Sequence, residues 1–116
     1  MSRLALAAGI AGFVTVAMGA FGAHGLKLTP EAQGWWNTAT FYALSHVVAA
    51  LAIAVSGRSQ LARAGWAFLI GAVIFGGTLY AMALGAPHFL GAVTPFGGLA
   101  FLAGWGLIIR AATTKL

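Results

Sequence analysis

Charged side chains are scarce in this sequence, and this scarcity restricts the folds that it can adopt. Six of the 116 residues are Lys or Arg, only Glu31 is acidic, and 61% are hydrophobic. About a quarter of the residues in soluble domains are charged, because their surface has to face water. The apolar runs are also too long for a disordered chain. The composition therefore excludes a soluble globular protein and predicts an integral membrane protein.

Four apolar runs have the length of a membrane-crossing helix, about 20 residues. Short segments rich in Gly, Pro, Ser and charged residues separate them and indicate turns. The first run exceeds the roughly 7 to 15 residues of a signal-peptide core, so we expect a membrane helix there. A single membrane domain accounts for residues 1–116, with predicted spans at residues 4–23, 36–55, 64–84 and 95–112.

The basic residues predict the orientation of these spans. Four crossings place both termini on one side, together with five of the six basic residues, and only Lys27 lies opposite. Because basic residues favour the cytoplasmic side, we expect both termini to be cytoplasmic. Their isolation between apolar runs also argues against a nucleic-acid partner. The five residues are Arg3, Arg58, Arg63, Arg110 and Lys115.

Small residues follow one face of each predicted helix. Helices inside lipid associate through close packing, so such faces predict helix–helix contacts. Short loops favour antiparallel neighbours, and we expect an all-α fold, a compact antiparallel four-helix bundle. Thr94 is expected to cap a last helix that starts at Pro95, where a missing N–H does no harm. The residues expected at the helix contacts are Gly12, Gly19, Gly22, Ala43, Gly76, Gly97 and Gly104.

His46 is the most informative side chain, because it lies near the middle of the second span. Ionisable residues inside a membrane are often functional. It falls on the small-residue face, so we expect it to point into the bundle, with Tyr42 one turn away. Two interpretations stay open. The imidazole forms a structural hydrogen bond to another helix, worth about 0.6 to 2 kcal/mol, or it acts on a ligand, proton or cofactor.

A polar pocket at the outer face is a second candidate site. His24 and His88 are expected at that face, where they could line a pocket with Tyr42 and Tyr80. The alternative is that both histidines anchor the chain at the interface. His46 should lie about 14 Å deeper than His24 at 1.5 Å per residue, so we expect no three-histidine metal site and no bound cofactor.

Catalytic groups are not apparent in this sequence. Hydrolysis and acid–base chemistry usually need a carboxylate, a nucleophile with its base, or a metal. The only carboxylate, Glu31, is expected in a loop, there is no Cys, and no Ser or Thr lies in a nucleophile motif. We therefore predict no catalytic residues and a protein that is not an enzyme.

Several strings occur in an order that points to a known family. They are GAFGAHGL at residues 19–26, Tyr42 with His46, FGGTLY at 75–80, GAVTPFGG at 91–98, and Gly104 with Trp105. Together they resemble the small membrane family catalogued as domain of unknown function 423, which is related to the human transmembrane protein 256. This chain has Ala43 and Gly76 where that family usually has Gln and Ser, which removes any hydrogen bond made through those side chains.

The resemblance implies a multi-pass protein of the bacterial inner membrane with four helices and no established activity. It directs attention to His24, Tyr42, His46 and Tyr80, and to Thr94 with Pro95. These are the motif positions that carry polarity or special backbone geometry.

Three functional hypotheses are compatible with the sequence. The first is an accessory or assembly subunit that packs with other membrane proteins, favoured by the small-residue faces, the short loops and the lack of catalytic groups. The second is a homo-oligomeric transporter or channel for a small solute that uses His46 and Tyr42. The third is a binder of haem, quinone or lipid between the helices. The expected partners are the lipid bilayer and either another membrane protein or further copies of the chain.

Overall fold

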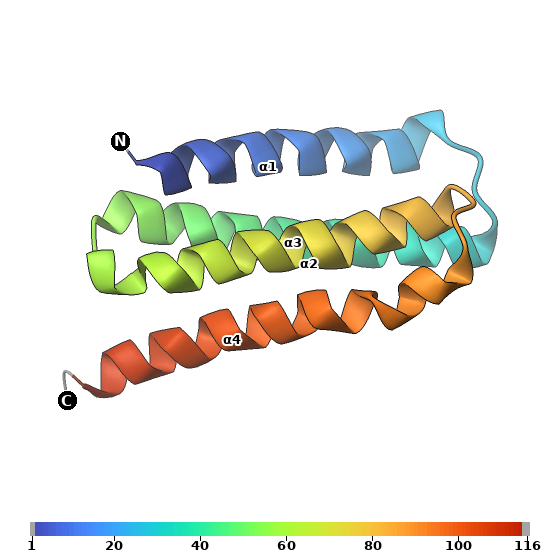
Figure 1. The fold of residues 1–116 in the computed structure, drawn as a ribbon. Helices are drawn as coiled ribbons and strands as arrows, with labels where there is room; N and C mark the ends of the chain where they lie inside the picture. Colours follow the sequence, from blue (N-terminus) through green and yellow to red (C-terminus); the bar gives the residue numbers. More distant parts are fainter. Residues whose placement is uncertain (1, 115–116) are drawn as a thin grey trace.

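Four long helices account for most of residues 2–114, which the computed structural model describes (Figure 1). With the helical turns at their ends they are 23 to 27 residues long and apolar enough to cross a membrane. Successive helices run in opposite directions. The prediction of an all-α membrane protein with four antiparallel helices is confirmed. The helices are α1 (Arg3–Ala20), α2 (Pro30–Ser56), α3 (Ala62–Ala83) and α4 (Thr94–Thr113).

The α2–α3 pair forms the centre of the bundle, and α1 and α4 lie on its two sides (Figure 1). α3 packs extensively on both α2 and α4, whereas α1 packs mainly on α2 and much less on α3. The molecule measures 48 × 27 × 19 Å, with the long dimension along the helices. Because α1 contacts α3 only sparsely, a groove stays open between these two helices.

Most of the basic residues belong to the end of the bundle at which α1 begins and α4 ends (Figure 1). Lys27 lies at the opposite end, in the connection between α1 and α2. Lys115, which also entered the orientation prediction, falls outside the described residues. We call the end of the bundle at which α1 begins the basic end. Its described basic residues are Arg3, Arg58, Arg63 and Arg110.

α2 begins at Pro30, six residues before the start expected from hydropathy. The Thr29 hydroxyl accepts a hydrogen bond from the backbone N–H of Ala32 at 3.1 Å, and Pro30 stands in the first turn, which needs no N–H from it. Glu31 therefore lies in the first helical turn, where the helix dipole favours an acid, and not in a loop. Thr29, Pro30 and Glu31, which suggest a turn when the sequence is read alone, are the residues at which α2 starts.

Thr94 does not cap α4, and this expectation was wrong. The chain before it forms a 3₁₀ turn, His88–Ala92, which leads directly into the helix. The Thr94 hydroxyl donates back to the carbonyl oxygen of Leu90 at 3.1 Å and shares a hydrogen bond with Thr78 of α3 at 2.6 Å. Pro95 does lie in the first turn of α4. Because the preceding turn is already helical, Thr94 is free to join α4 to α3.

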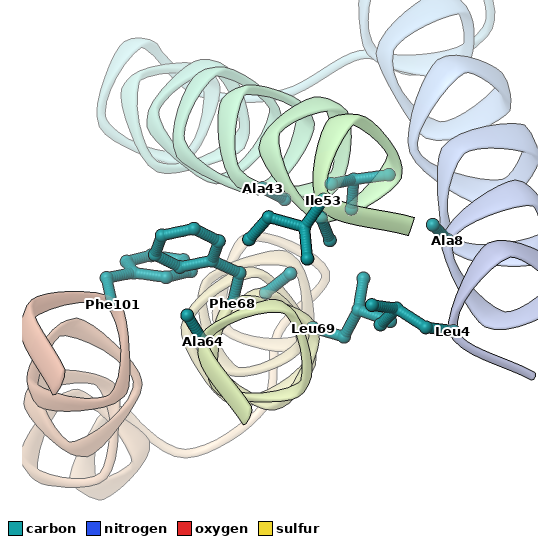
Figure 2. Packing of buried hydrophobic residues seen from close by; sticks show 11 residues of the cluster. Leu4, Ala8, Ala43, Ile53, Ala64, Phe68, Leu69 and Phe101 are labelled. Carbon is teal, nitrogen blue, oxygen red and sulfur yellow. The ribbon is translucent and has the colours of Figure 1, made fainter. Parts of the chain in front are cut away.

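Apolar side chains from all four helices meet in one core (Figure 2). Leu4 and Ala8 reach it from α1, Ala64 and Phe68 from α3, and Phe101 from α4. Ala64 and Phe68 are almost completely buried, so they mark the centre of this core. The two phenylalanine rings also form the wall against which His46 packs.

The glycines expected at helix contacts lie where two helices approach closely. Gly97 of α4 leaves no room for a Cβ against the backbone of Phe75, and Gly104 leaves none against the ring of Phe68. Any larger residue at these positions would push α4 away from α3, because interiors are close-packed. The other glycine contacts are those of Gly12 with Val47, Gly19 with Thr40, Gly22 with Trp36, and Gly76 with Ala43.

Candidate functional site

His46 lies inside the bundle between α2 and α4, with 8% of its surface exposed. Its ring stacks on Phe101, with centroids 3.7 Å apart and planes 11° from parallel. The ring of Phe68 meets it nearly edge-on at 5.2 Å. The alanines that flank His46 on the same face of α2 allow α3 and α4 to come this close. Aromatic rings from two helices therefore enclose the imidazole.

Both nitrogens of the imidazole have a partner. The indole N–H of Trp105 donates to Nε2 at 3.0 Å, and Nδ1 lies 2.7 Å from the backbone carbonyl oxygen of Tyr42. An indole can only donate and a carbonyl can only accept, so Nε2 carries no hydrogen and Nδ1 carries one. These partners fix His46 as the neutral Nδ1–H tautomer.

This arrangement favours the structural interpretation of His46. A metal ion or a second proton on Nε2 would need the lone pair that Trp105 already occupies. Trp105 would have to swing away and leave its N–H without a partner, at a cost of about 1 to 3 kcal/mol. The imidazole therefore serves as a hydrogen-bond acceptor that joins α4 to α2.

Tyr42 does not share a pocket with His46. Its side chain is 43% exposed on the membrane-facing side of α2, between the rings of Phe41 and Phe75. Within residues 2–114 its hydroxyl makes no hydrogen bond, and only its backbone carbonyl reaches the imidazole. Two side chains four residues apart on a helix differ in direction by about 40°. That rotation is enough to direct His46 inward and Tyr42 outward.

Tyr80 is buried and takes part in a hydrogen bond between helices rather than in an open polar pocket. Four hydrogen bonds of this kind connect one helix to another within residues 2–114. Each of the four helices takes part in at least one of them. Hydrogen bonds of this kind are each worth about 0.6 to 1.7 kcal/mol within a membrane. We call them the interhelical bonds. They join Trp36 Nε1 to the Met18 carbonyl (α1–α2, 2.7 Å), Thr40 to Tyr80 (α2–α3, 2.6 Å), Thr78 to Thr94 (α3–α4, 2.6 Å) and Trp105 to His46 (α2–α4, 3.0 Å).

His24 and His88 are exposed at the end opposite the basic end. His24 lies in the π-helical turn that closes α1, and His88 meets the ring of Trp35 edge-on at 5.3 Å. The aromatic and hydrogen-bond contacts of the described chain link neither histidine to His46 or to the two tyrosines. Among residues 2–114, no three His, Cys, Asp or Glu side chains lie close enough together to hold a metal ion.

A groove between α1 and α2 brings polar groups to the membrane-facing surface. Asn37 is exposed in it, and its Oδ1 accepts a hydrogen bond from Gln33 Nε2 at 2.8 Å. Its own NH₂ group has no partner among the described residues. The polar residues Gln33, Asn37 and Ser45 recur at four- and eight-residue spacing on α2, and this spacing is the sequence signal for a polar stripe. The groove, which we call the amide groove, measures about 620 Å³ and is lined by Gly19, Asn37, Thr40, Phe41, Leu44, Ser45 and Val48.

Comparison with known proteins agrees with the membrane fold. The family model described as "Protein of unknown function (DUF423)" matches residues 18–98. The UPF0382 membrane protein YwdK of Bacillus subtilis (strain 168) is 40% identical over 110 residues, which cover 89% of each chain. The UPF0382 inner membrane protein YgdD of Escherichia coli (strain K12) is also 40% identical over 110 residues, 88% of this chain and 82% of its own. No solved structure matches.

Proposed function

The chain belongs to the DUF423 family of membrane proteins, and from this premise we propose that it is a non-enzymatic accessory subunit that packs beside another protein of the inner membrane. The names of its relatives give a location and no activity, so the proposal rests on the geometry of this molecule. The observation that carries it is the exposed amide of Asn37 in the amide groove.

The depth of Asn37 makes this amide informative. α2 has 27 residues and is about 40 Å long, whereas the hydrocarbon core of a bilayer is about 30 Å thick. Asn37 lies seven residues after Pro30, so in a centred helix its Cα is about 5 Å inside the hydrocarbon. An NH₂ group at that depth loses its water and gains no partner from lipid chains. A polar group on a neighbouring transmembrane helix would supply one.

The groove around Asn37 suits such a helix. Gly19 lowers one of its walls, and small residues let helix backbones approach closely in a membrane. The hydroxyls of Thr40 and Ser45 are already bonded within this chain, to Tyr80 and to the Phe41 carbonyl. The amide of Asn37 is thus the group left for a partner, which we expect to present a carbonyl, amide or hydroxyl oxygen there.

The interior supports a role without transport or catalysis. Among the described residues, no buried side-chain nitrogen or oxygen lacks a hydrogen-bond partner. Nε2 of His46 and the Tyr80 hydroxyl are bonded to other helices, and Nδ1 of His46 is bonded within α2, so neither side chain has a free polar group for a solute path. We also propose that the basic end faces the cytoplasm, because four described basic residues lie there against Lys27 at the other end.

Photo-cross-linking in native membranes tests the accessory role. A benzoylphenylalanine replaces Phe41 in the amide groove, and in the control it replaces Leu102 on α4, which has the same exposure of 67%. We expect a discrete adduct with one other membrane protein from position 41 only, and we expect Asn37→Leu to weaken it. Equal labelling from both positions would argue against a docked partner. An adduct between two copies would favour a homo-oligomer instead.

A further inference from the structure

The basic end carries a pocket that the proposed partner contact does not involve. It measures about 570 Å³ and lies where the start of α1, the end of α2 and the start of α3 meet. Its lining includes two arginines and two serines, Arg3, Arg58, Ser2 and Ser59, together with Trp66 of α3. We call it the basic pocket.

Within residues 2–114, the two arginines of the basic pocket have no acidic side chain near them. Glu31 is the only acidic side chain in the sequence. It lies in the first turn of α2, whereas Arg58 follows the end of that helix, about 40 Å away. Both arginines are exposed, so their donors are available to a ligand. Guanidinium groups bind phosphate oxygens through paired N–H donors, which makes an anionic phosphate group the complementary ligand.

An apolar groove continues from the basic pocket into the membrane. It runs between α1 and α3, measures about 780 Å³ and shares Trp66 with the basic pocket. Ile10 and Val14 form its α1 side, and Ile70 and Val73 its α3 side, with no charged residue in its lining. We call it the α1–α3 groove. The pocket and the groove follow one another along the same faces of the same two helices.

The α1–α3 groove is long enough to hold a lipid chain. One leaflet contributes about 15 Å to the hydrocarbon core, which corresponds to about ten residues of helix. The α3 lining of the groove runs from Trp66 to Leu84, about 27 Å at 1.5 Å per residue, so it is longer than one leaflet is deep. An acyl chain that starts near Trp66 fills its first part, as far as about Gly77. A ligand with a phosphate at the basic pocket and an acyl chain below it has the chemistry of a membrane phospholipid.

We propose that the basic pocket and the α1–α3 groove together bind one anionic phospholipid, with its phosphate between Arg3 and Arg58 and an acyl chain packed along Trp66. A net negative headgroup is favoured over a zwitterionic one because the described residues that line the basic pocket include two positive charges and no negative charge. This inference does not depend on the identity of a protein partner, since the amide groove lies between α1 and α2.

Fluorescence quenching by brominated lipids tests the proposal. The full chain is reconstituted in phosphatidylcholine vesicles that hold a small fraction of phosphatidylglycerol with brominated acyl chains. The labelled lipid is in both leaflets, so the protein's orientation does not affect the result. We expect tryptophan quenching at roughly tenfold lower lipid fraction than with brominated phosphatidylcholine. We expect Trp66→Phe to remove most of this selective quenching.

Two double variants separate a defined site from general attraction. Arg3→Gln with Arg58→Gln should abolish the preference for the anionic lipid. Arg63→Gln with Arg110→Gln removes the same charge from the same end but not from the basic pocket, and should retain the preference. Circular dichroism checks that both variants stay helical. In the wild type, the preference should also weaken at high salt.

Four outcomes would overturn the proposal. Equal losses in the two double variants would show diffuse surface attraction. Unchanged quenching after Trp66→Phe would show that the acyl chain lies elsewhere. Complete suppression by millimolar inorganic phosphate would show a site for free phosphate rather than lipid. Detection of a second copy or another protein's helix in the α1–α3 groove would assign that groove to a protein.

Discussion

The hydrogen bond between Trp105 and His46 is the interaction whose loss we expect to measure best. Trp105→Phe removes the indole N–H and leaves Nε2 of a buried imidazole without a donor. An unsatisfied buried acceptor costs about 1 to 3 kcal/mol, and we expect a loss of about 2 kcal/mol in the free energy of unfolding. Trp66→Phe is the matched control, because the described chain gives its indole no hydrogen bond.

A double-mutant cycle isolates the bond itself. His46→Leu also breaks it, and the two changes together leave neither an orphan donor nor an orphan acceptor. The double variant should therefore be more stable than the sum of the two single losses predicts, by about 0.6 to 1.7 kcal/mol. Unfolding in mixed micelles, followed by circular dichroism, gives the four free energies. Additivity within about 0.3 kcal/mol would refute the bond as an energetic link between α2 and α4.

The imidazole tautomer provides an independent check of the same reasoning. Nitrogen NMR of histidine-labelled protein at neutral pH should show the neutral form of His46 with hydrogen on Nδ1, as its two partners require. In Trp105→Phe the constraint on Nε2 is gone, so we expect that signal to change. A charged imidazole or an Nε2–H form in the wild type would contradict the geometry.

Two further pairs of variants test the helix contacts. Gly97→Ala should lower the free energy of unfolding by about 1 to 3 kcal/mol because its Cβ meets the backbone of Phe75, whereas Gly98→Ala, with open space around it, should be nearly neutral. Thermal unfolding in detergent compares them. Tyr80→Phe removes an interhelical bond and should cost about 0.6 to 1.7 kcal/mol, whereas Tyr42→Phe should have no effect, since that hydroxyl is unbonded within residues 2–114. An equal effect of the two tyrosine variants in the same assay would argue against this assignment.

The number of helices and their antiparallel order follow from the sequence, because a membrane requires each span to satisfy its own backbone hydrogen bonds. Hydropathy alone misplaced the start of α2, since Thr29 and Pro30 are polar or turn-forming residues that also begin helices. For the same reason Glu31 was expected in a loop. Helix ends depend on capping, which hydropathy does not measure.

Sequence periodicity indicates which way a side chain points, but not which helix it meets. The alanines around His46 predict that it points inward, and it is buried. Its partner Trp105 lies 59 residues away, and their meeting depends on how α4 is placed and rotated beside α2. The expected pocket with Tyr42 and Tyr80 was not found because Tyr42 of α2 lies at the surface, whereas Tyr80 of α3 is buried and bonded to Thr40. The amide groove, the α1–α3 groove and the basic pocket depend on distances between helices, which the sequence of a single span does not determine.

The contact between Ala43 and Gly76 shows how this chain differs from the pattern its motifs resemble. A Cβ on Gly76 would lie 3.4 Å from that of Ala43, so these two positions face each other across α2 and α3. Where Gln and Ser stand there, the side chains can bond between the helices, and replacing only one would leave the other polar group against an apolar surface. Replacing both leaves a close apolar contact instead. The bond between Thr40 and Tyr80, about one turn away on each helix, remains as the polar connection between α2 and α3. In this chain, α2 and α3 are therefore held at this level by close apolar packing beside that one polar connection.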